Sequence, residues 1–255
     1  MKIATWNVNS LRVRLPQVLD WLEQARPDVL ALQETKITDE EFPTDDLKNV
    51  GYHAIYAGQK TYNGVAILSK KAGTHTITEI PDLADPQKRV IGANFGEIRL
   101  INLYVPNGSS VGSDKYQYKL YWLNKLRDYV ANQRSKHSEL LVVGDFNITP
   151  EDQDVHNPEL WQGQILCSAP ERAALHQLMD VGLVDLFREF EQEPNAFSWW
   201  DYRAGAFRRN MGLRIDLILA SKSLVKKCTA CYIDREPRKL AKPSDHAPVV
   251  AEFDI

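Results

Sequence analysis

The sequence predicts an α/β fold in which two β-sheets pack face to face and helices cover their outer faces. About ten segments have the pattern of strands and about four that of helices, with no residue-level repeat or low-complexity tract. Several strands are continuously apolar, such as Leu140 to Val143, which is typical of strands covered on both faces. Because no linker divides the chain, we expect one domain over residues 1–255.

The first half of the chain is predicted to supply most of the strands. Leu15, Val18, Leu19 and Leu22 fall at helical spacing and predict a helix that ends before Pro27. Thr38-x-x-Glu41 has the spacing of a capping box and predicts a short helix. The predicted strands of this half are Lys2 to Asn7, Asp28 to Glu34, Tyr52 to Ala57 paired with Val65 to Ser69, Thr74 to Ile80, Arg89 to Phe95 and Ile98 to Val105.

The second half mixes helices, loops and strands. After Pro106-Asn-Gly108, a helix of about twenty residues is predicted, and its apolar positions are Tyr118, Trp122, Leu126, Tyr129 and Val130. A capping box at Ser168-Ala-Pro-Glu171 begins another helix, which runs through Leu178. Leu183 to Phe190 is also predicted to be helical, and Phe197 to Phe207 to be a loop. The remaining predicted strands are Leu140 to Asn147, Arg214 to Ala220 and Cys228 to Asp234, and Ser244 to Phe253 closes the chain.

Composition narrows the class of protein. No run of eighteen apolar residues is present, and the N-terminus enters a strand-like segment at once, so we expect neither a membrane span nor a signal peptide. We therefore expect a cytoplasmic protein. We also expect it to be a monomer. The three cysteines fit a reducing compartment better than a disulfide framework. Cys228 and Cys231 would face opposite ways in a strand and have no second pair, which favours structural thiols over a zinc site.

Charge is unevenly distributed along the chain. The net charge is 31 minus 34, or −3, yet residues 202–242 contain eleven Lys or Arg and three acids, a local excess of +8. Such a run is often only a solvated face. Next to Trp199, Trp200, Tyr202 and Phe207, however, the cations suit a surface where arginines meet phosphates and aromatic rings pack on sugars or bases.

Polar side chains close or interrupt the apolar strands at several points. In Leu140 to Asn147, strand periodicity would place Asp145 and Asn147 on the same face. The full set is Asn7, Glu34, Tyr104, Asp145, Asn147, Asp216, Asp245 and His246. Buried carboxylates cost several kcal/mol unless they are paired or ligate a metal, so we expect this set to converge. Carboxylate and amide oxygens without cysteine predict a hard cation, Mg²⁺ or Mn²⁺, that would assist phosphate-ester hydrolysis.

These residues occur in six motifs that resemble, in order, those of exonuclease III and the apurinic/apyrimidinic endonucleases, members of the endonuclease/exonuclease/phosphatase superfamily. The motifs are Trp6-Asn-Val-Asn9, Leu32-Gln-Glu-Thr-Lys36, Leu103-Tyr-Val-Pro-Asn-Gly108, Gly144-Asp-Phe-Asn147, Leu213-Arg-Ile-Asp216 and Ser244-Asp-His246. The match extends through Phe197 to Arg203 and Pro243 to Pro248. The resemblance implies a four-layer α/β sandwich of two mixed sheets, like deoxyribonuclease I.

The resemblance also implies roles for individual residues. Glu34 would hold Mg²⁺ with help from Asn7 and Asp245, and Asp145, Asn147 and His246 complete the candidate metal set. The candidate catalytic residues are Tyr104, Asp145, Asn147, Asp216 and His246. Asp145 would activate or position the attacking water, Asn147 would hold water and phosphate, Tyr104 would contact the phosphate, and His246, oriented by Asp216, would donate to the phosphoryl oxygen.

The implied substrate is double-stranded DNA with abasic sites or 3′ ends. Trp199 would wall a pocket for a baseless sugar, and the candidate DNA-contacting residues are Trp199, Tyr202, Arg203, Arg208, Arg209 and Arg214. Trp200 and Leu213 depart from residues seen in relatives, and the stretch 165–167 matches no pattern, so lesion preference stays open. The alternatives are a phosphatase or phosphodiesterase for lipid or inositol head groups, which would call for an exposed apolar membrane loop, and a non-catalytic DNA-binding relative.

Overall fold

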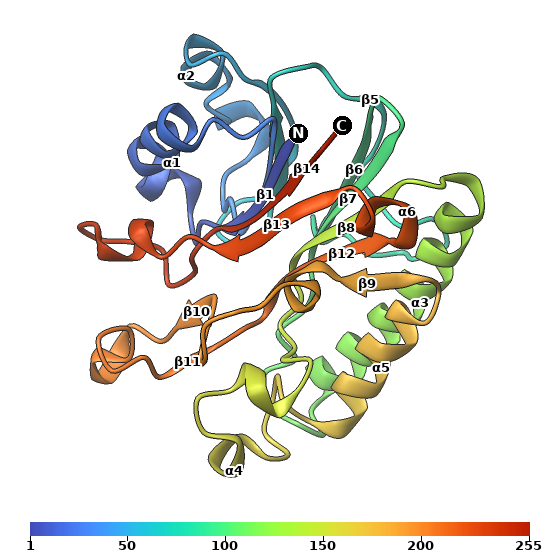
Figure 1. The fold of residues 1–255 in the computed structure, drawn as a ribbon, viewed down its shortest axis with the longest axis vertical. Helices are drawn as coiled ribbons and strands as arrows, with labels where there is room; N and C mark the ends of the chain where they lie inside the picture. Colours follow the sequence, from blue (N-terminus) through green and yellow to red (C-terminus); the bar gives the residue numbers. More distant parts are fainter.

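The computed structural model describes residues 1–255 and contains two six-stranded sheets that lie face to face (Figure 1). The first sheet has the order β13-β14-β1-β2-β4-β3 and the second β5-β6-β7-β8-β12-β9. The strands of the first sheet are β1 Lys2–Asn7, β2 Val29–Gln33, β3 His53–Ala57, β4 Val65–Ser69, β13 Cys228–Ile233 and β14 Val249–Phe253. Those of the second are β5 Thr74–Ile77, β6 Val90–Phe95, β7 Ile98–Tyr104, β8 Leu140–Asp145, β9 Leu183–Asp185 and β12 Asp216–Ser221.

Both sheets are mixed. Each has one parallel pair near its centre, β1 with β2 and β7 with β8, and the other neighbouring strands are antiparallel. The carboxyl ends of a parallel pair lie at the same edge of the sheet. This arrangement matters for the site because Asn7, Tyr104 and Asp145 are the last residues of β1, β7 and β8.

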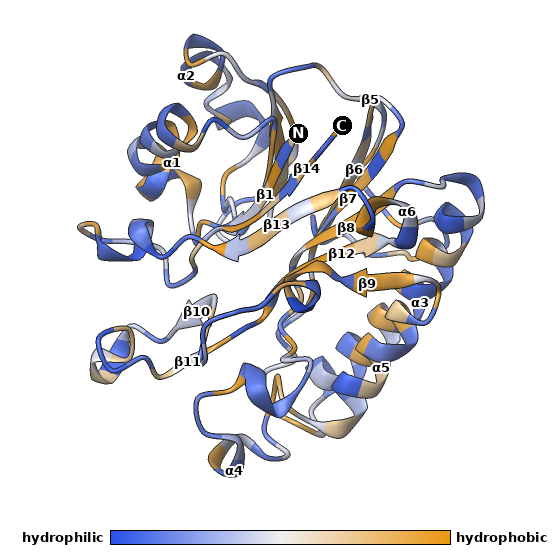
Figure 2. Ribbon diagram, viewed as in Figure 1, coloured by the Kyte–Doolittle hydropathy of each residue, from blue (hydrophilic) through white to orange (hydrophobic).

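Helices complete the four layers. Helices α1 (Leu11–Ala25) and α2 (Thr44–Asn49) pack outside the first sheet, and α3 (Asp114–Lys136) and α5 (Ala169–Met179) outside the second (Figure 1). The largest group of buried apolar residues lies between the sheets. In β8, Leu141 and Val143 enter this central core while Leu140 and Val142 pack toward α3 and α5, which explains the continuous apolar run. Figure 2 shows β8, β9 and β12 of the second sheet as predominantly hydrophobic.

Several sequence predictions of helices are confirmed with adjusted ends. Helix α1 begins at Leu11, four residues before the first apolar position used to predict it. Helix α3 spans 23 residues, and the Ser113 side chain caps it by accepting from the Tyr116 amide at 3.2 Å. The predicted box at Ser168 and Glu171 is present at the start of α5. None of the helices combines the length and the apolar composition that a membrane span requires.

Three predictions of local structure are wrong. The Thr38 side chain makes no capping bond, and Asp39–Glu41 forms only a 3-10 turn before Phe42 and Pro43. Leu183 to Phe190 is not an α-helix, because β9 pairs with β12 and the Asp185 side chain accepts from the Phe187 amide to start the 3-10 turn Leu186–Glu189. Phe197 to Phe207 is not wholly a loop, because β10 (Trp199–Trp200) pairs with β11 (Gly212–Leu213).

The expectation that Cys228 and Cys231 face opposite ways is also wrong. The pairing of β13 with β14 shifts register between Cys228 and Ala230, and such a bulge inserts an extra residue into the strand. As a result, both thiol side chains pack against the core between the sheets. All three cysteines are unpaired. The remaining short α-helices are α4 (Pro158–Trp161) and α6 (Lys222–Val225), and 3-10 turns form at Asp152–Asp154, Arg203–Gly205 and Glu236–Lys239.

Candidate active site

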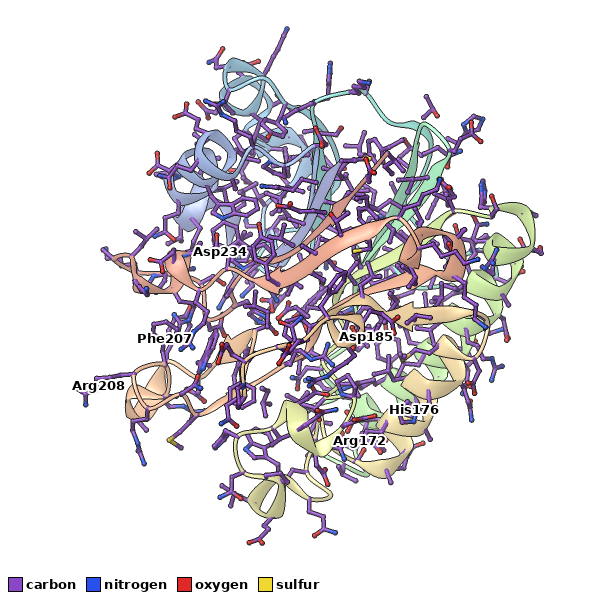
Figure 3. The ribbon with its side chains drawn as sticks, viewed as in Figure 1. Arg172, His176, Asp185, Phe207, Arg208 and Asp234 are labelled. Carbon is purple, nitrogen blue, oxygen red and sulfur yellow. The ribbon has the colours of Figure 1, made fainter.

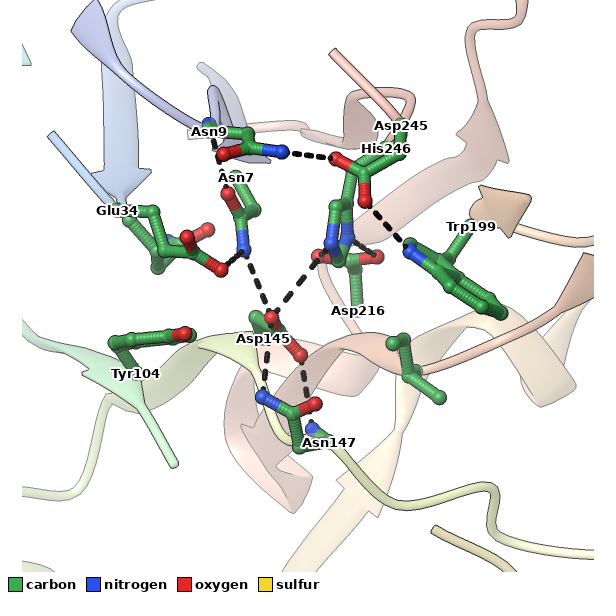
Figure 4. Close-up of polar contacts among 12 residues, drawn as sticks. Asn7, Asn9, Glu34, Tyr104, Asp145, Asn147, Trp199, Asp216, Asp245 and His246 are labelled. Atoms are coloured by element: carbon green, nitrogen blue, oxygen red, sulfur yellow. Dashed lines mark hydrogen bonds and ion pairs between the residues drawn. The ribbon is translucent and has the colours of Figure 1, made fainter. Parts of the chain in front are cut away.

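The polar residues that the sequence singled out meet at one edge of the sandwich (Figure 4). Two features of the sheets bring them together. Tyr104 and Asp145 are register partners in the parallel pair β7 and β8, and Asp216 faces Asp145 because β12 runs antiparallel to β8. Across the gap between the sheets, the Asn7 amide donates to Asp145 Oδ2 at 2.8 Å. Strand ends from both sheets therefore build one site.

Asp145 lies at the centre of this site and is only 1% exposed. Its carboxylate accepts from the backbone amide of Asn147 at 2.9 Å and from the Asn147 carboxamide at 3.3 Å, in addition to the Asn7 bond. His246 Nε2 lies 3.8 Å away. Burial raises the pKa of Asp145 to about 7, with His246 opposing the shift and the charges of Asp216 and Glu34 adding to it.

Local backbone geometry determines how Asp145 and Asn147 are presented. Gly144 has φ +140°, and a Cβ there would lie 2.0 Å from the Leu103 carbonyl oxygen, so only glycine allows β8 to approach β7 this closely. Beyond the end of the strand, Asn147 adopts φ +49°, a left-handed conformation that asparagine tolerates well. The two polar side chains do meet as predicted, but through this turn rather than through strand alternation.

His246 is oriented by Asp216. Its Nδ1 lies 2.9 and 3.1 Å from the two carboxylate oxygens, and Ser198 Oγ donates to the same carboxylate at 2.7 Å. Burial opposes the imidazolium charge, but the neighbouring carboxylates of Asp216 and Asp145 outweigh it and raise the pKa of His246 to about 10. The ring is therefore protonated near neutral pH, and its Nε2 faces Asp145 as a donor.

Glu34 and Tyr104 occupy the opposite side of the site. Glu34, at φ +51°, accepts from the Asn7 amide at 3.0 Å and pairs with Lys36 at 2.7 Å. Burial alone would raise the pKa of Glu34, but the Lys36 charge and hydrogen bonds outweigh it and lower that pKa. Burial, then the charges of Glu34 and Asp145, raise the pKa of Tyr104 well above its usual value, so its hydroxyl stays a donor. The Arg89 guanidinium stacks on the Tyr104 ring at 4.7 Å.

Asp245 links the site to its aromatic rim. Its carboxylate accepts from the Asn9 amide and from Trp199 Nε1, each at 2.9 Å. The loop that carries it is anchored to β1, because Ser244 Oγ donates to the Asn7 carbonyl and Trp6 Nε1 to the His246 carbonyl. Asp245 therefore lies at the same edge of the sandwich as Glu34, but the two carboxylates have different hydrogen-bond partners.

The donor set fits a hard divalent cation. One Asn7 amide group bridges the Glu34 and Asp145 carboxylates, so two neighbouring acidic groups share a neutral partner. The ligand atoms of Asp145, Asp216 and His246 also lie within 4.8 Å of one another. Oxygen donors dominate and no cysteine is present in this cluster, which matches the preference of Mg²⁺ and Mn²⁺ over zinc.

The predicted DNA-contacting residues separate into two groups. Tyr202, Arg203, Arg208 and Arg209 are exposed on the segment between β10 and β11, and Trp199 is half-buried beside the site. Arg208 points away from the body of the protein (Figure 3). Arg203 is paired with Asp201 at 2.6 Å on the surface.

The prediction that Arg214 contacts DNA is wrong. Its side chain is 1% exposed and pairs with Asp154 at 2.6 Å and Asp185 at 2.7 Å, so it is not available to contact DNA. Trp200 is likewise buried, and the half-buried Phe207 packs edge-on against it with ring centres 5.0 Å apart. These two aromatic residues stabilise the segment instead of forming its DNA-facing surface.

Sequence reasoning missed several residues that complete the site. Lys36 and Asn9 fall inside motifs that were recognised, and Lys36 Nζ donates to Asn9 Oδ1 at 2.6 Å. Ser198, whose hydroxyl donates to Asp216, lies in the segment Phe197 to Arg203 that the sequence had already singled out. Lys119 gave no signal, because a charged residue in an amphipathic helix is normally assigned to the solvent side. Glu171 was identified only as part of the capping box at Ser168.

The fold and the site together define an enzyme of the phosphodiester-hydrolysing class, with acid groups, carboxamides and an imidazolium placed at the open edge of two stacked sheets. The chain belongs to the endonuclease/exonuclease/phosphatase family, whose model matches residues 4–246. This membership confirms the resemblance seen in the sequence and the two-sheet fold that it implied.

Relatives match the chain over its whole length. It is 40% identical to exodeoxyribonuclease III of Haemophilus influenzae, covering 99% of this chain and 100% of the relative. The structure of the 3′ phosphatase NExo from Neisseria, bound to a product DNA hairpin, matches with a TM-score of 0.98 and 45% identity, and an AP endonuclease from Archaeoglobus fulgidus with 0.96 and 39%, each covering 100% of both chains.

Proposed function

We propose that this protein is a Mg²⁺-dependent DNA-repair phosphodiesterase that acts on abasic sites and 3′ ends of duplex DNA. The observation that carries the proposal is the arrangement of Asp145 between the Asn7–Glu34 pair and the Asp216–His246 pair. The relatives' names, an exodeoxyribonuclease, a 3′ phosphatase bound to DNA and an AP endonuclease, support the same substrate class.

In this proposal the metal set is Asn7, Glu34, Asp145, Asn147 and Asp245, with Glu34 as the principal ligand. His246, which the sequence also placed in this set, is assigned to the donors because its protonated ring has no lone pair for a metal. When bound, Mg²⁺ or Mn²⁺ would polarise the phosphoryl oxygen and stabilise the leaving oxygen. Asp145 positions the attacking water, Asn147 holds water and phosphate, Tyr104 donates to the phosphate, and His246 donates from Nε2 to the phosphoryl oxygen as negative charge develops.

The surface beside the site suits a nucleic-acid backbone. A hollow of about 600 Å³ borders the site and is lined by Arg89, Asn107, Lys115 and eight other residues. On another side, the segment between β10 and β11 exposes Arg203, Arg208 and Arg209. An enzyme acting on lipid head groups would need an apolar membrane-contacting loop there. The exposed arginines therefore favour DNA over lipid as the substrate.

The proposal is tested with labelled duplexes: one carrying a single abasic analogue, one with a plain recessed 3′ end and one with a 3′-phosphate end. Each is incubated with Mg²⁺ or with EDTA. We expect cleavage of at least one duplex in Mg²⁺ and none in EDTA. Cleavage that survives EDTA, or no reaction with any substrate, contradicts the proposal. The relative rates determine which lesion is preferred.

The exposed arginines give a separate prediction. The double variant Arg208→Gln/Arg209→Gln should bind duplex DNA more weakly, and the slope of log K against log salt should fall by about one for each phosphate that the protein no longer neutralises. Binding is measured by fluorescence anisotropy between low and moderate salt. Lys222→Gln/Lys226→Gln, which removes two exposed charges at α6, is the matched control. If the two double variants show equal salt slopes, Arg208 and Arg209 face solvent and do not neutralise DNA phosphates.

A further inference from the structure

Behind the candidate active site, helices α3 and α5 contribute a lysine and a glutamate that are completely buried. The Lys119 and Glu171 side chains are both 0% exposed, and Lys119 Nζ lies 2.5 Å from Glu171 Oε1. A buried ion pair is weak support for stability, because well-packed apolar residues can replace such a pair at little or no cost. The hydrogen-bond partners of Lys119 and Glu171 indicate a role other than stabilising the fold.

The Lys119 ammonium has three donors and three acceptors. Besides Glu171, it donates to the backbone carbonyls of Asn147 at 2.6 Å and Asn107 at 3.1 Å. These two asparagines are themselves joined, since the Asn107 amide donates to Asn147 Oδ1 at 3.1 Å. One buried cation thus binds the backbone of Asn147, the residue whose carboxamide donates to Asp145.

The cation contacts the backbone at both positions. Asn147 is in the left-handed region at the end of β8, and its backbone carbonyl accepts from the Lys119 ammonium. Next to Asn107, Gly108 has φ +91°, and a Cβ there would lie 3.1 Å from Lys119 Cδ and 3.0 Å from Ile165 Cδ1. The lysine stem therefore packs directly under the 106–108 turn, and its ammonium reaches the Asn107 carbonyl within that turn and the Asn147 carbonyl of the neighbouring segment.

Glu171 connects the same cation to the stretch 165–168, most of which the sequence left unassigned. Its carboxylate also accepts from the Leu166 amide at 3.1 Å and from the amide and hydroxyl of Ser168 at 3.1 and 2.6 Å. Leu166 has φ +71°, and its side chain joins an apolar cluster against which Trp199 packs at the rim of the site. The glutamate orients the lysine and fixes this neighbouring turn as well.

We propose that Lys119, oriented by Glu171, is a positioning residue that keeps the Asn147 carboxamide directed at Asp145. Lys119 is fully enclosed, so its effect on the reaction passes through Asn147 and not through the substrate. The inference rests on the proposed function. The Asn147 carboxamide donates to the Val105 carbonyl at 3.0 Å and to Asp145 at 3.3 Å. If the Asn147 backbone lost its Lys119 donor, we expect the carboxamide to shift relative to Asp145, and small displacements of such groups slow reactions substantially.

The test uses the double variant Lys119→Met/Glu171→Gln, which removes both buried charges while keeping side chains of similar length. Lys119→Met alone would leave Glu171 buried without its cation and is avoided for that reason. We expect kcat on the preferred duplex to fall about tenfold to thirtyfold with KM within about twofold of the wild-type value. Looser packing alone would not lower kcat while leaving KM nearly unchanged.

Asn147→Ala supplies the decisive comparison. If Lys119 acts through Asn147, adding the double substitution to Asn147→Ala should reduce single-turnover rates by less than about twofold further. If the rate reduction of the combined variant equals the product of the reductions from Asn147→Ala and from Lys119→Met/Glu171→Gln, the proposal is overturned. An unchanged kcat in Lys119→Met/Glu171→Gln also overturns it. An increase in KM at constant kcat also overturns it.

Hydrogen exchange gives a readout that does not depend on catalysis. In the double variant, the amides of residues 146–149 should exchange faster, while those of β1 stay protected. Unchanged exchange there overturns the inference even if the wild-type protein proves inactive, and wild-type inactivity itself contradicts only the proposed function. Arg99→Met is the matched control: it removes a buried cation that donates to the His75 carbonyl at 2.7 Å, near the opposite end of β7 from Tyr104, and should leave kcat unchanged.

Discussion

Asp145→Asn is expected to lower kcat by about 10²-fold or more while folding and DNA binding are preserved. The substitution keeps the size of the side chain and one acceptor oxygen, which can still accept from the Asn147 backbone amide. Its NH2 group replaces the oxygen that accepts from the Asn7 amide. It removes the charge that places the attacking water and attracts the imidazolium 3.8 Å away. Burial raises the pKa of this carboxyl to about 7, so a neutral side chain avoids the cost of burying a charge there.

The measurement is steady-state cleavage of the preferred duplex in Mg²⁺, together with DNA affinity and thermal unfolding. Asp46→Asn, on the exposed surface of α2, is the control for removal of a carboxylate and should match the wild type. Unchanged turnover in Asp145→Asn would remove Asp145 from the mechanism. A large decrease in DNA affinity would instead assign the residue to binding.

His246→Gln is expected to lower kcat by about 10²-fold to 10³-fold, with a smaller effect on KM, because its donor acts on charge that develops in the transition state. The glutamine amide is neutral and cannot replace an imidazolium whose pKa is raised to about 10. Asp216→Asn should change kcat in the same direction, since it removes the carboxylate that orients the ring at 2.9 Å.

Single-turnover rates in saturating Mg²⁺ test this prediction, and His53→Gln, at an exposed position of β3, is the matched histidine control. If His246→Gln mainly raises the Mg²⁺ concentration required and recovers full activity at saturation, the residue belongs to the metal set and not to the donors. Wild-type rates at every Mg²⁺ concentration would exclude both roles.

Much of the fold could be predicted from local patterns. The run Leu140 to Val143 indicated a strand covered on both faces, and its side chains do divide between the two adjoining cores. The capping box at Ser168 and Glu171 placed the start of α5 correctly, whereas the same spacing at Thr38 and Glu41 produced only a 3-10 turn. The box at Thr38 failed because Pro43 follows closely and prevents a continuous helix.

The members of the site were also identifiable, because a polar residue at the end of an apolar strand is costly unless it has a purpose. Asn7, Glu34, Tyr104, Asp145, Asn147, Asp216, Asp245 and His246 all lie at the same edge (Figure 4). Their pairings were not evident from the sequence alone. Asn7 is bonded to Asp145 across 138 positions of the chain, and no local pattern specifies such a partner.

Burial of charge was decided by tertiary structure. Arg214 belongs to a basic run and was expected to face DNA, yet it pairs with Asp154, sixty positions away, in the interior. Lys119 lies in an amphipathic helix, where a lysine is normally assigned to solvent, and is enclosed by Glu171 and two backbone carbonyls. Apolar periodicity is encoded locally and indicates which face of an element is covered. The desolvation cost of a charge depends on partners that only the folded chain brings together.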